Sequence, residues 1–167
     1  GFTKFGGSDF RLQGDNRGTL TGDVVISGYN WFRLNNTYVL GGSTTNPYGK
    51  GNKLILNGAQ LYSESQLYYQ SEVVVNSDSN IGGNTAAYDR LTVNAYANND
   101  FGTPVVIRTT NNSTLNFYAM TVNGPVSFRG DTNTNAVTNI HGPITGLGSI
   151  QKWGINPLSF GALSPDY

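Results

Sequence analysis

Ten acidic residues are spread almost evenly along the 167-residue chain, which limits the acid–base chemistry that they could perform. Hydrolysis of a polysaccharide needs two carboxyl groups that converge on one face, often with a basic residue beside them. Asp15 and Asp23, with Arg17 close by, could converge if they lay on neighbouring turns of a repetitive fold. The interpretation that the sequence favours is a turn at 15–18 (Asp-Asn-Arg-Gly), in which Asp and Asn bind the backbone.

Other catalytic and metal-binding patterns do not occur in the sequence. His141 is the only histidine, no carboxylate lies near it along the chain, and cysteine is absent. Nucleophilic catalysis needs a base, and a metal site needs several ligands, so neither can be assembled around one histidine. Nucleophile elbows, zinc-protease motifs and phosphate-binding loops are also missing. We therefore expect no enzyme, no metal and no cofactor, and we expect His141 to face solvent on a strand.

Aromatic side chains make up 12% of the residues and form two clusters that could bind a ligand. Tyr and Trp on a flat β face can stack on sugars or anchor a protein partner. Alternatively, one residue of each neighbouring pair fills the interior of the fold. Neighbouring strand residues point to opposite faces, so one member of each adjacent pair should be exposed. The candidate binding residues are Tyr29, Trp31, Phe32, Tyr62, Tyr68 and Tyr69.

The charge balance and hydropathy exclude two classes of partner. Ten basic and ten acidic residues cancel to a formal net charge of zero. Binding of nucleic acid requires a clustered basic surface, so no nucleic-acid partner is expected. No apolar run approaches the roughly 20 residues that a membrane helix needs, so no membrane span is expected in this chain.

Short runs of alternating apolar and polar residues predict β-strands throughout the chain. Gly and Asn between the runs favour turns, and Asn at the corners is expected to stack into hydrogen-bonded ladders. No stretch has helical periodicity, so we expect no helix beyond a single turn at 63–69. Residues 41–53 and 77–88 are predicted to be loops. The strand runs include 54–56, 73–75, 91–93, 105–107, 115–117 and 126–128.

Three segments, 20–28, 122–130 and 140–148, share the pattern apolar-x-Gly-x-apolar. The last two start 18 positions apart (140 − 122), and a period near 20 corresponds to one coil of a β-solenoid. Gly would form the corners, while Val, Ile and Leu would stack inside on the neighbouring coils. We predict an all-β fold, a right-handed parallel β-helix with irregular loops, as one domain over residues 1–167. An antiparallel β-sandwich or jelly roll is the alternative, because it also alternates and turns on Gly.

The segment from Gly142 to Phe160 resembles the autotransporter-associated β-strand repeat, which reads roughly G-x-I-T-G-x-G-x-L-x-K-x-G-x-G-x-L-x-L-x-G. The chain departs from this pattern at 155–157, where Pro157 lacks the N–H that a central strand position donates. Segments 18–22, 111–117 and 120–124 are similar to passenger domains of vacuolating-cytotoxin-like autotransporters. The matching residues of the repeat are Gly142, Ile144, Thr145, Gly146, Gly148, Ile150, Lys152, Gly154, Leu158 and Phe160.

The resemblance implies a fragment of a longer bacterial passenger that is secreted or displayed at the cell surface. On this basis we expect a structural or adhesive segment of an adhesin or toxin, which binds and assembles rather than catalyses. Its partners would be adjacent β-helix coils, other copies of the chain, or a host protein receptor or glycan. The alternatives are a β-helix that binds or cleaves glycans, and a self-assembling fibre or shell subunit.

Overall fold

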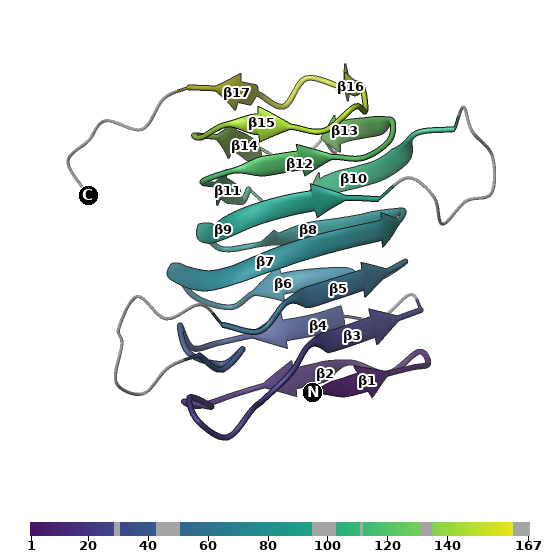
Figure 1. Cartoon of the computed structure of the whole chain (residues 1–167). Helices are drawn as coiled ribbons and strands as arrows, with labels where there is room; N and C mark the ends of the chain where they lie inside the picture. Colours follow the sequence, from purple (N-terminus) through teal and green to yellow (C-terminus); the bar gives the residue numbers. More distant parts are fainter. Residues whose placement is uncertain (29–30, 43–50, 95–102, 111, 131–134, 162–167) are drawn as a thin grey trace.

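A computed structural model describes residues 1–28, 31–42, 51–94, 103–110, 112–130 and 135–161. These residues form an all-β structure of two parallel sheets with no helix (Figure 1). Sheet A contains β1 (Phe2–Lys4), β3 (Val24–Ser27), β5 (Leu54–Asn57), β7 (Leu67–Ser77), β9 (Ala86–Val93), β11 (Thr114–Phe117), β12 (Met120–Val122), β14 (Val137–Ile140), β15 (Ile144–Thr145) and β17 (Leu158–Phe160). Sheet B contains β2 (Phe10–Leu12), β4 (Trp31–Leu34), β6 (Gln60–Ser63), β8 (Ser79–Gly83), β10 (Val105–Thr110), β13 (Val126–Gly130) and β16 (Ile150–Trp153).

From β1 to β10 the chain alternates between the two sheets, so each strand pairs with the next strand but one. Val24 of β3 pairs with Leu54 of β5, for example, and Phe32 of β4 pairs with Leu61 of β6. Every pairing found among the described residues is parallel, so the antiparallel sandwich or jelly roll is wrong. The Gly- and Asn-rich turns lead the chain across to the other sheet instead of reversing it within one sheet.

The strand pairing of sheet A changes at two long strands, β7 and β9. β7 and β9 pair along most of their length, with an irregular register between Tyr69 and Glu72. The first part of β9 pairs with β11 and its last part with β12, so one long strand is followed by two short ones. From β11 onward each pass of the chain therefore contributes three strands, and sheet A has a corner where β9 changes partner.

The core lies between the sheets and is built from rows of side chains that occupy matching positions on successive strands. Tyr69, Tyr88 and Phe117 stack with centroid separations of 5.2 and 5.6 Å. Leu54, Val73 and Leu91 form a second buried row in the same register. Because each residue packs on its counterparts in neighbouring passes, burial depends on the stack as a whole.

A ladder of asparagines runs along the outside of sheet A. The Nδ2 of Asn76 donates to Oδ1 of Asn57 at 2.9 Å, Asn94 donates to Asn76 at 3.0 Å, and Asn123 donates to Asn94 at 2.8 Å. Asn57 in turn donates to Ser27 Oγ at 3.3 Å. The expected stacking of Asn side chains is thereby confirmed.

The segments 122–130 and 140–148, which start 18 residues apart, do not pair with each other at that spacing. Val126 pairs with Ile150, and Met120 pairs with Ile144, so the passes are offset by 24 residues there (150 − 126). The apolar residue after the Gly begins β13 in the segment 122–130 (Val126) but begins β15 in the segment 140–148 (Ile144). The shared pattern marks a glycine corner before a strand, and each pass contains more than one such corner.

Two local predictions are also corrected. Residues 77–88 are not one loop, because they contain the whole of β8 and the start of β9. The polar sequence of β8 conceals a strand in which Ser79, Asn80 and Ile81 are all buried. Residues 63–69 form no helical turn; they include the end of β6, a bend and the start of β7. Of the other predicted loop, 41–53, residues 43–50 lie outside the described residues.

Candidate binding surfaces

A cluster of aromatic and charged side chains lies on the outer face of sheet B, where β4 pairs with β6. Trp31 and Arg33 point outward because Phe32 and Leu34 between them are buried in the core. The rings of Trp31 and Tyr62 meet edge-on, with centroids 5.6 Å apart. The guanidinium of Arg33 lies 5.2 Å from the Tyr62 centroid and 5.9 Å from that of Trp31. We call Trp31, Arg33 and Tyr62 the Trp31 patch.

Ion pairs hold the arginine of the Trp31 patch in place. Nη2 of Arg33 lies 2.9 Å from Asp9, and its Nη1 lies 3.9 Å from Glu64. Arg11, which pairs in register with Arg33, lies 2.5 Å from the same Glu64 oxygen. Exposed ion pairs contribute little stability. Here they fix the orientation of a cation between two aromatic rings.

The predicted alternation within adjacent aromatic pairs is confirmed. Phe32 and Tyr69 are fully buried, whereas Trp31 is half-buried on the outer face and Tyr68 is 39% exposed. Phe32 and Tyr69 therefore belong to the core and not to a binding surface. Tyr29 lies outside the described residues.

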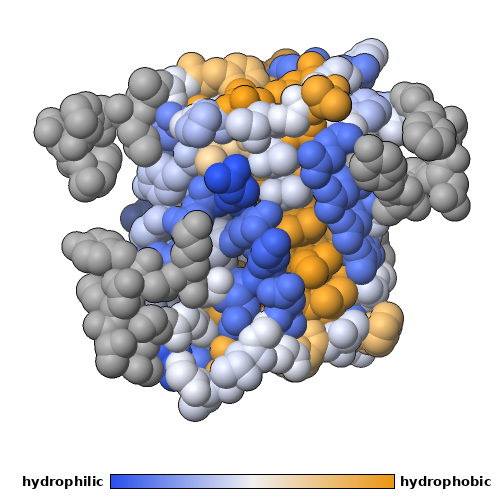
Figure 2. Space-filling view, viewed as in Figure 1, coloured by the Kyte–Doolittle hydropathy of each residue, from blue (hydrophilic) through white to orange (hydrophobic). Residues whose placement is uncertain are grey.

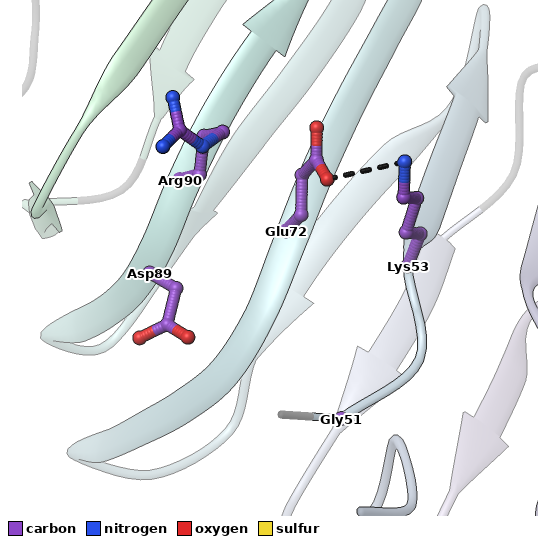
Figure 3. A pocket seen from close by; sticks show the side chains of 5 residues that line it. All are labelled: Gly51, Lys53, Glu72, Asp89 and Arg90. Carbon is purple, nitrogen blue, oxygen red and sulfur yellow. Dashed lines mark ion pairs between the residues drawn. The ribbon is translucent and has the colours of Figure 1, made fainter. Parts of the chain in front are cut away.

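Sheet A carries a second cluster, at the corner where β7 and β9 change register. Lys53, Glu72, Asp89 and Arg90 line a pocket of about 350 Å³ together with Gly51 (Figure 3). Glu72 pairs in register with Arg90, so the four side chains come from neighbouring passes of the chain. In Figure 2 a hydrophilic patch and a hydrophilic band lie on either side of an apolar strip on this face. Val25, Ile55 and Val74 form an outward-facing apolar row in register on β3, β5 and β7.

Contacts restrain the charged groups of this pocket, including Asp89, which accepts the hydroxyl of Tyr68. Lys53 Nζ lies 3.3 Å from Glu72 Oε2, and Glu72 Oε1 accepts the hydroxyl of Thr92 at 2.5 Å. Arg90 donates to Thr121 Oγ1 at 3.0 Å. The carboxylates thus have donors beside them, and the basic groups have acceptors.

An aromatic row continues from the pocket along the stack. Tyr68 donates its hydroxyl to Asp89, and its ring meets Tyr118 edge-on at 5.3 Å. The Tyr118 ring lies 5.8 Å from the ring of His141, whose Nε2 is 2.8 Å from Oδ1 of Asn116. Burial, assisted by Asp89, raises the pKa of Tyr68, so this hydroxyl stays a donor.

Tyr118 and His141 also line a second, wider pocket of about 590 Å³ beside β14 and β17. His141 therefore takes part in a surface cluster. It directly follows β14 and is only half-exposed, whereas the sequence predicted a solvent-facing residue on a strand. Together the two pockets and the contacts between them form what we call the sheet A site. It consists of Lys53, Tyr68, Glu72, Asp89, Arg90, Tyr118 and His141.

Sequence reasoning missed most of the sheet A site because its residues lie far apart along the chain. One signal could have found the charged part. Lys53, Glu72 and Arg90 each directly precede an apolar-x-apolar run, at 54–56, 73–75 and 91–93. Because these runs pair in register on neighbouring strands, the residues that precede them lie side by side in one row.

Asp15 and Asp23, the two carboxylates considered for hydrolysis, accept hydrogen bonds from backbone N–H groups. Asp15 accepts the backbone N–H and the Nε–H of Arg17, both at 3.0 Å, and this hydrogen bonding lowers the pKa of the Asp15 carboxyl. Asp23 accepts the backbone N–H of Lys53 at 3.1 Å. The turn interpretation of Asp15 is confirmed. In the part of the chain that the structure describes, no group of His, Asp and Glu side chains could hold a metal ion.

The residues of the repeat-like segment occupy the last pass of the chain. A Cβ added at Gly142 or Gly146 would overlap the carbonyl of Tyr118 or Val122 in the preceding pass, so both positions require glycine. Several side chains here are exposed because the described pairing stops at β15, β16 and β17. The residues of the segment lie on the last strands and their connections. Ile144 and Thr145 lie in β15, Ile150 and Lys152 in β16, Leu158 and Phe160 in β17, and Gly148 and Gly154 in the connections.

No helix among the described residues is long and apolar enough to cross a membrane. Comparisons with family models, with curated proteins and with solved structures give no match for this chain.

Proposed function

We propose that the chain is a segment of a right-handed parallel β-helix. The support is the alternation of consecutive strands between two parallel sheets, with each pass of the chain hydrogen-bonded to the next. The interior aromatic stack and the outer asparagine ladder also repeat from pass to pass, as they do when a chain winds around one axis.

We further propose that this β-helix is an adhesive segment of a bacterial surface or secreted passenger and that it contacts a protein partner. The observation that carries this function is the Trp31 patch. Trp, Tyr and Arg are the residues most enriched at the energetic centres of protein interfaces. Here a tryptophan, an arginine and a tyrosine are held in mutual contact on an outer face, so little side-chain freedom is lost on binding.

Adherence of bacteria that display the chain tests this function. The chain is displayed on a non-adherent bacterium, and the bacteria that remain on a monolayer of epithelial cells are counted after washing. Trp31→Ala and Tyr62→Ala should each reduce the number of adherent bacteria by about tenfold or more. Gln151→Ala, an exposed change on β16 of the same sheet, is the matched control and should bind like the parent.

The outcome of this experiment separates adhesion from a purely structural role. Adherence that is absent, or that is equal in all variants, would overturn the proposal. Thermal unfolding followed by circular dichroism shows whether each variant retains the fold. A loss of adherence counts only for variants whose unfolding midpoint stays near that of the parent.

Assembly along the stack is a second candidate function, favoured by the apolar side chains around the last pass. Leu147 and Ile155 are 102% and 76% exposed, and Trp153 is 59% exposed. Strands that pair on one side only can template another strand, from further coils or from a second copy of the chain. Sedimentation of the chain should show association that Ile155→Lys reduces. A concentration-independent monomer would count against assembly between copies.

A further inference from the structure

We propose that the sheet A site binds a neutral oligosaccharide that runs along the stack, across the strands. This site lies on the other sheet from the Trp31 patch, and the inference does not depend on the protein partner proposed above. It rests on three properties of the site, namely its length, its aromatic surface and its balanced charges.

The length of the site suits an oligomer better than a single sugar. Lys53 precedes β5, Glu72 and Asp89 lie on β7 and β9, and Tyr118 and His141 follow β11 and β14. These five strands are consecutive neighbours in sheet A. Adjacent strands are about 4.8 Å apart, so the site extends for roughly 20 Å.

The aromatic part provides a surface on which sugar rings can stack. Tyr68 is 39% exposed, and its ring contacts Tyr118, which in turn contacts His141. Aromatic rings of this kind offer an apolar face with a polar edge, which matches the mixed character of a pyranose. Contacts on both sides of Tyr118 hold the platform in place before a ligand arrives.

The charged part provides donors and acceptors for hydroxyl groups without a net charge. Glu72 and Asp89 accept hydrogen bonds, whereas Lys53 and Arg90 donate them. The two acidic and two basic side chains cancel within the pocket. A phosphate, sulfate or uronate chain would gain no net attraction from a pocket whose charges cancel, whereas a neutral sugar uses both kinds of partner.

Binding of defined oligosaccharides by isothermal titration calorimetry tests the inference. The probes are neutral cello-, malto-, manno- and N-acetylchito-oligosaccharides, with oligogalacturonates and heparin oligosaccharides as acidic counterparts. At least one neutral series should bind, with affinity that rises with chain length, and the acidic series should not. Tyr118→Ala should weaken that binding by about tenfold, the upper range for loss of one aromatic contact. Asp89→Asn, which keeps the shape of the side chain but removes its charge, should weaken it as well.

Two control variants keep the result interpretable. Trp153→Ala removes an exposed aromatic side chain from β16 outside the site and should leave sugar binding unchanged. Trp31→Ala should also leave it unchanged, so failure of this inference and failure of the protein-binding proposal are distinguishable. If Tyr118→Ala lowers the unfolding midpoint, Asp89→Asn carries the test. Absence of binding by every neutral series at millimolar concentration, preference for acidic sugars, or equal binding by Asp89→Asn and the parent would overturn the inference.

Discussion

The rings of Tyr69 and Tyr88 lie nearly parallel in the core, 5.2 Å apart, but among the described residues only the Tyr69 hydroxyl has a hydrogen-bond partner. The Tyr69 hydroxyl lies 3.0 Å from Ser63 Oγ and donates to the Leu34 carbonyl at 3.3 Å. The Tyr88 hydroxyl is buried and has no hydrogen-bond partner among the described residues. Two side chains of the same type in the same stack therefore differ in the free energy that their oxygen contributes.

Removing each oxygen in turn should change stability in opposite directions. Tyr69→Phe should lower the free energy of unfolding by about 1 kcal/mol, because it removes hydrogen bonds from a buried group. Tyr88→Phe should raise it by up to about 1 kcal/mol, because an unsatisfied buried hydroxyl is removed without loss of the ring. Urea unfolding followed by circular dichroism measures both. A Tyr88→Phe variant as destabilised as Tyr69→Phe would contradict this interpretation.

The buried tyrosines should make the fold sensitive to alkali. Burial raises the pKa of Tyr69 to about 12, and it raises the pKa of Tyr88 well above its ordinary value of 10.0. Between about pH 10 and pH 12 the unfolded chain releases these protons while the folded chain keeps them. Stability should therefore be constant up to about pH 10 and then fall by about 1.4 kcal/mol per pH unit for each tyrosine. Urea unfolding of the parent and of Tyr69→Phe between pH 9 and pH 12 measures this slope. The slope of the variant should be smaller by the contribution of one tyrosine.

The position of an asparagine in the outer ladder should determine its contribution to stability. Asn94 donates to Asn76 and accepts from Asn123, whereas the Asn123 side chain makes one bond among the described residues. At about 1 kcal/mol for each bond, Asn94→Ala should cost roughly twice as much as Asn123→Ala. Chemical unfolding of the two variants provides the comparison. Equal costs would show that the ladder contributes through something other than its hydrogen bonds.

Glycine should be required at one corner of the last pass and dispensable shortly after it. Gly146 has a φ of +99°, and a Cβ there would overlap the Val122 carbonyl. Gly146→Ala should therefore lower the free energy of unfolding by about 2 kcal/mol or more. Gly161 has open space around it and no positive φ, so Gly161→Ala is the control and should be close to neutral. Thermal unfolding of both variants measures the difference, and a neutral Gly146→Ala would refute the steric argument.

Local alternation predicted which face of a strand a residue occupies, but it did not predict which strands are neighbours. The pairs Trp31 with Phe32 and Tyr68 with Tyr69 divide between outside and inside as expected, because the two-residue period is a property of any strand. The offset between passes is not such a local property. It is 18 residues from Val73 to Leu91 (91 − 73) and 29 from Leu91 to Met120 (120 − 91). A single fixed period could therefore not place the sheet A site.

Polarity misled the sequence interpretation where the structure buries polar groups. β8 has the sequence Ser-Asn-Ile-Gly-Gly, which is typical of a turn, but it pairs on both sides with β6 and β10. There is no room for a side chain at Gly82, because a Cβ at this position would overlap Thr110 on the neighbouring strand. Close approach between passes favours small residues, and composition alone cannot distinguish this requirement from that of a loop.

The order of the strands also determines how the molecule would respond to tension. β1 and β2 lie at one end of the two sheets, and β16 and β17 lie at the other (Figure 1). A pull on the two ends of the chain would load the outermost pairing first and peel one pass at a time, like a zipper. Because the offsets between passes differ, the extension released at each step would range from about 60 Å for 18 residues to about 100 Å for 30. Such a molecule would dissipate mechanical work in a series of unequal steps instead of failing all at once.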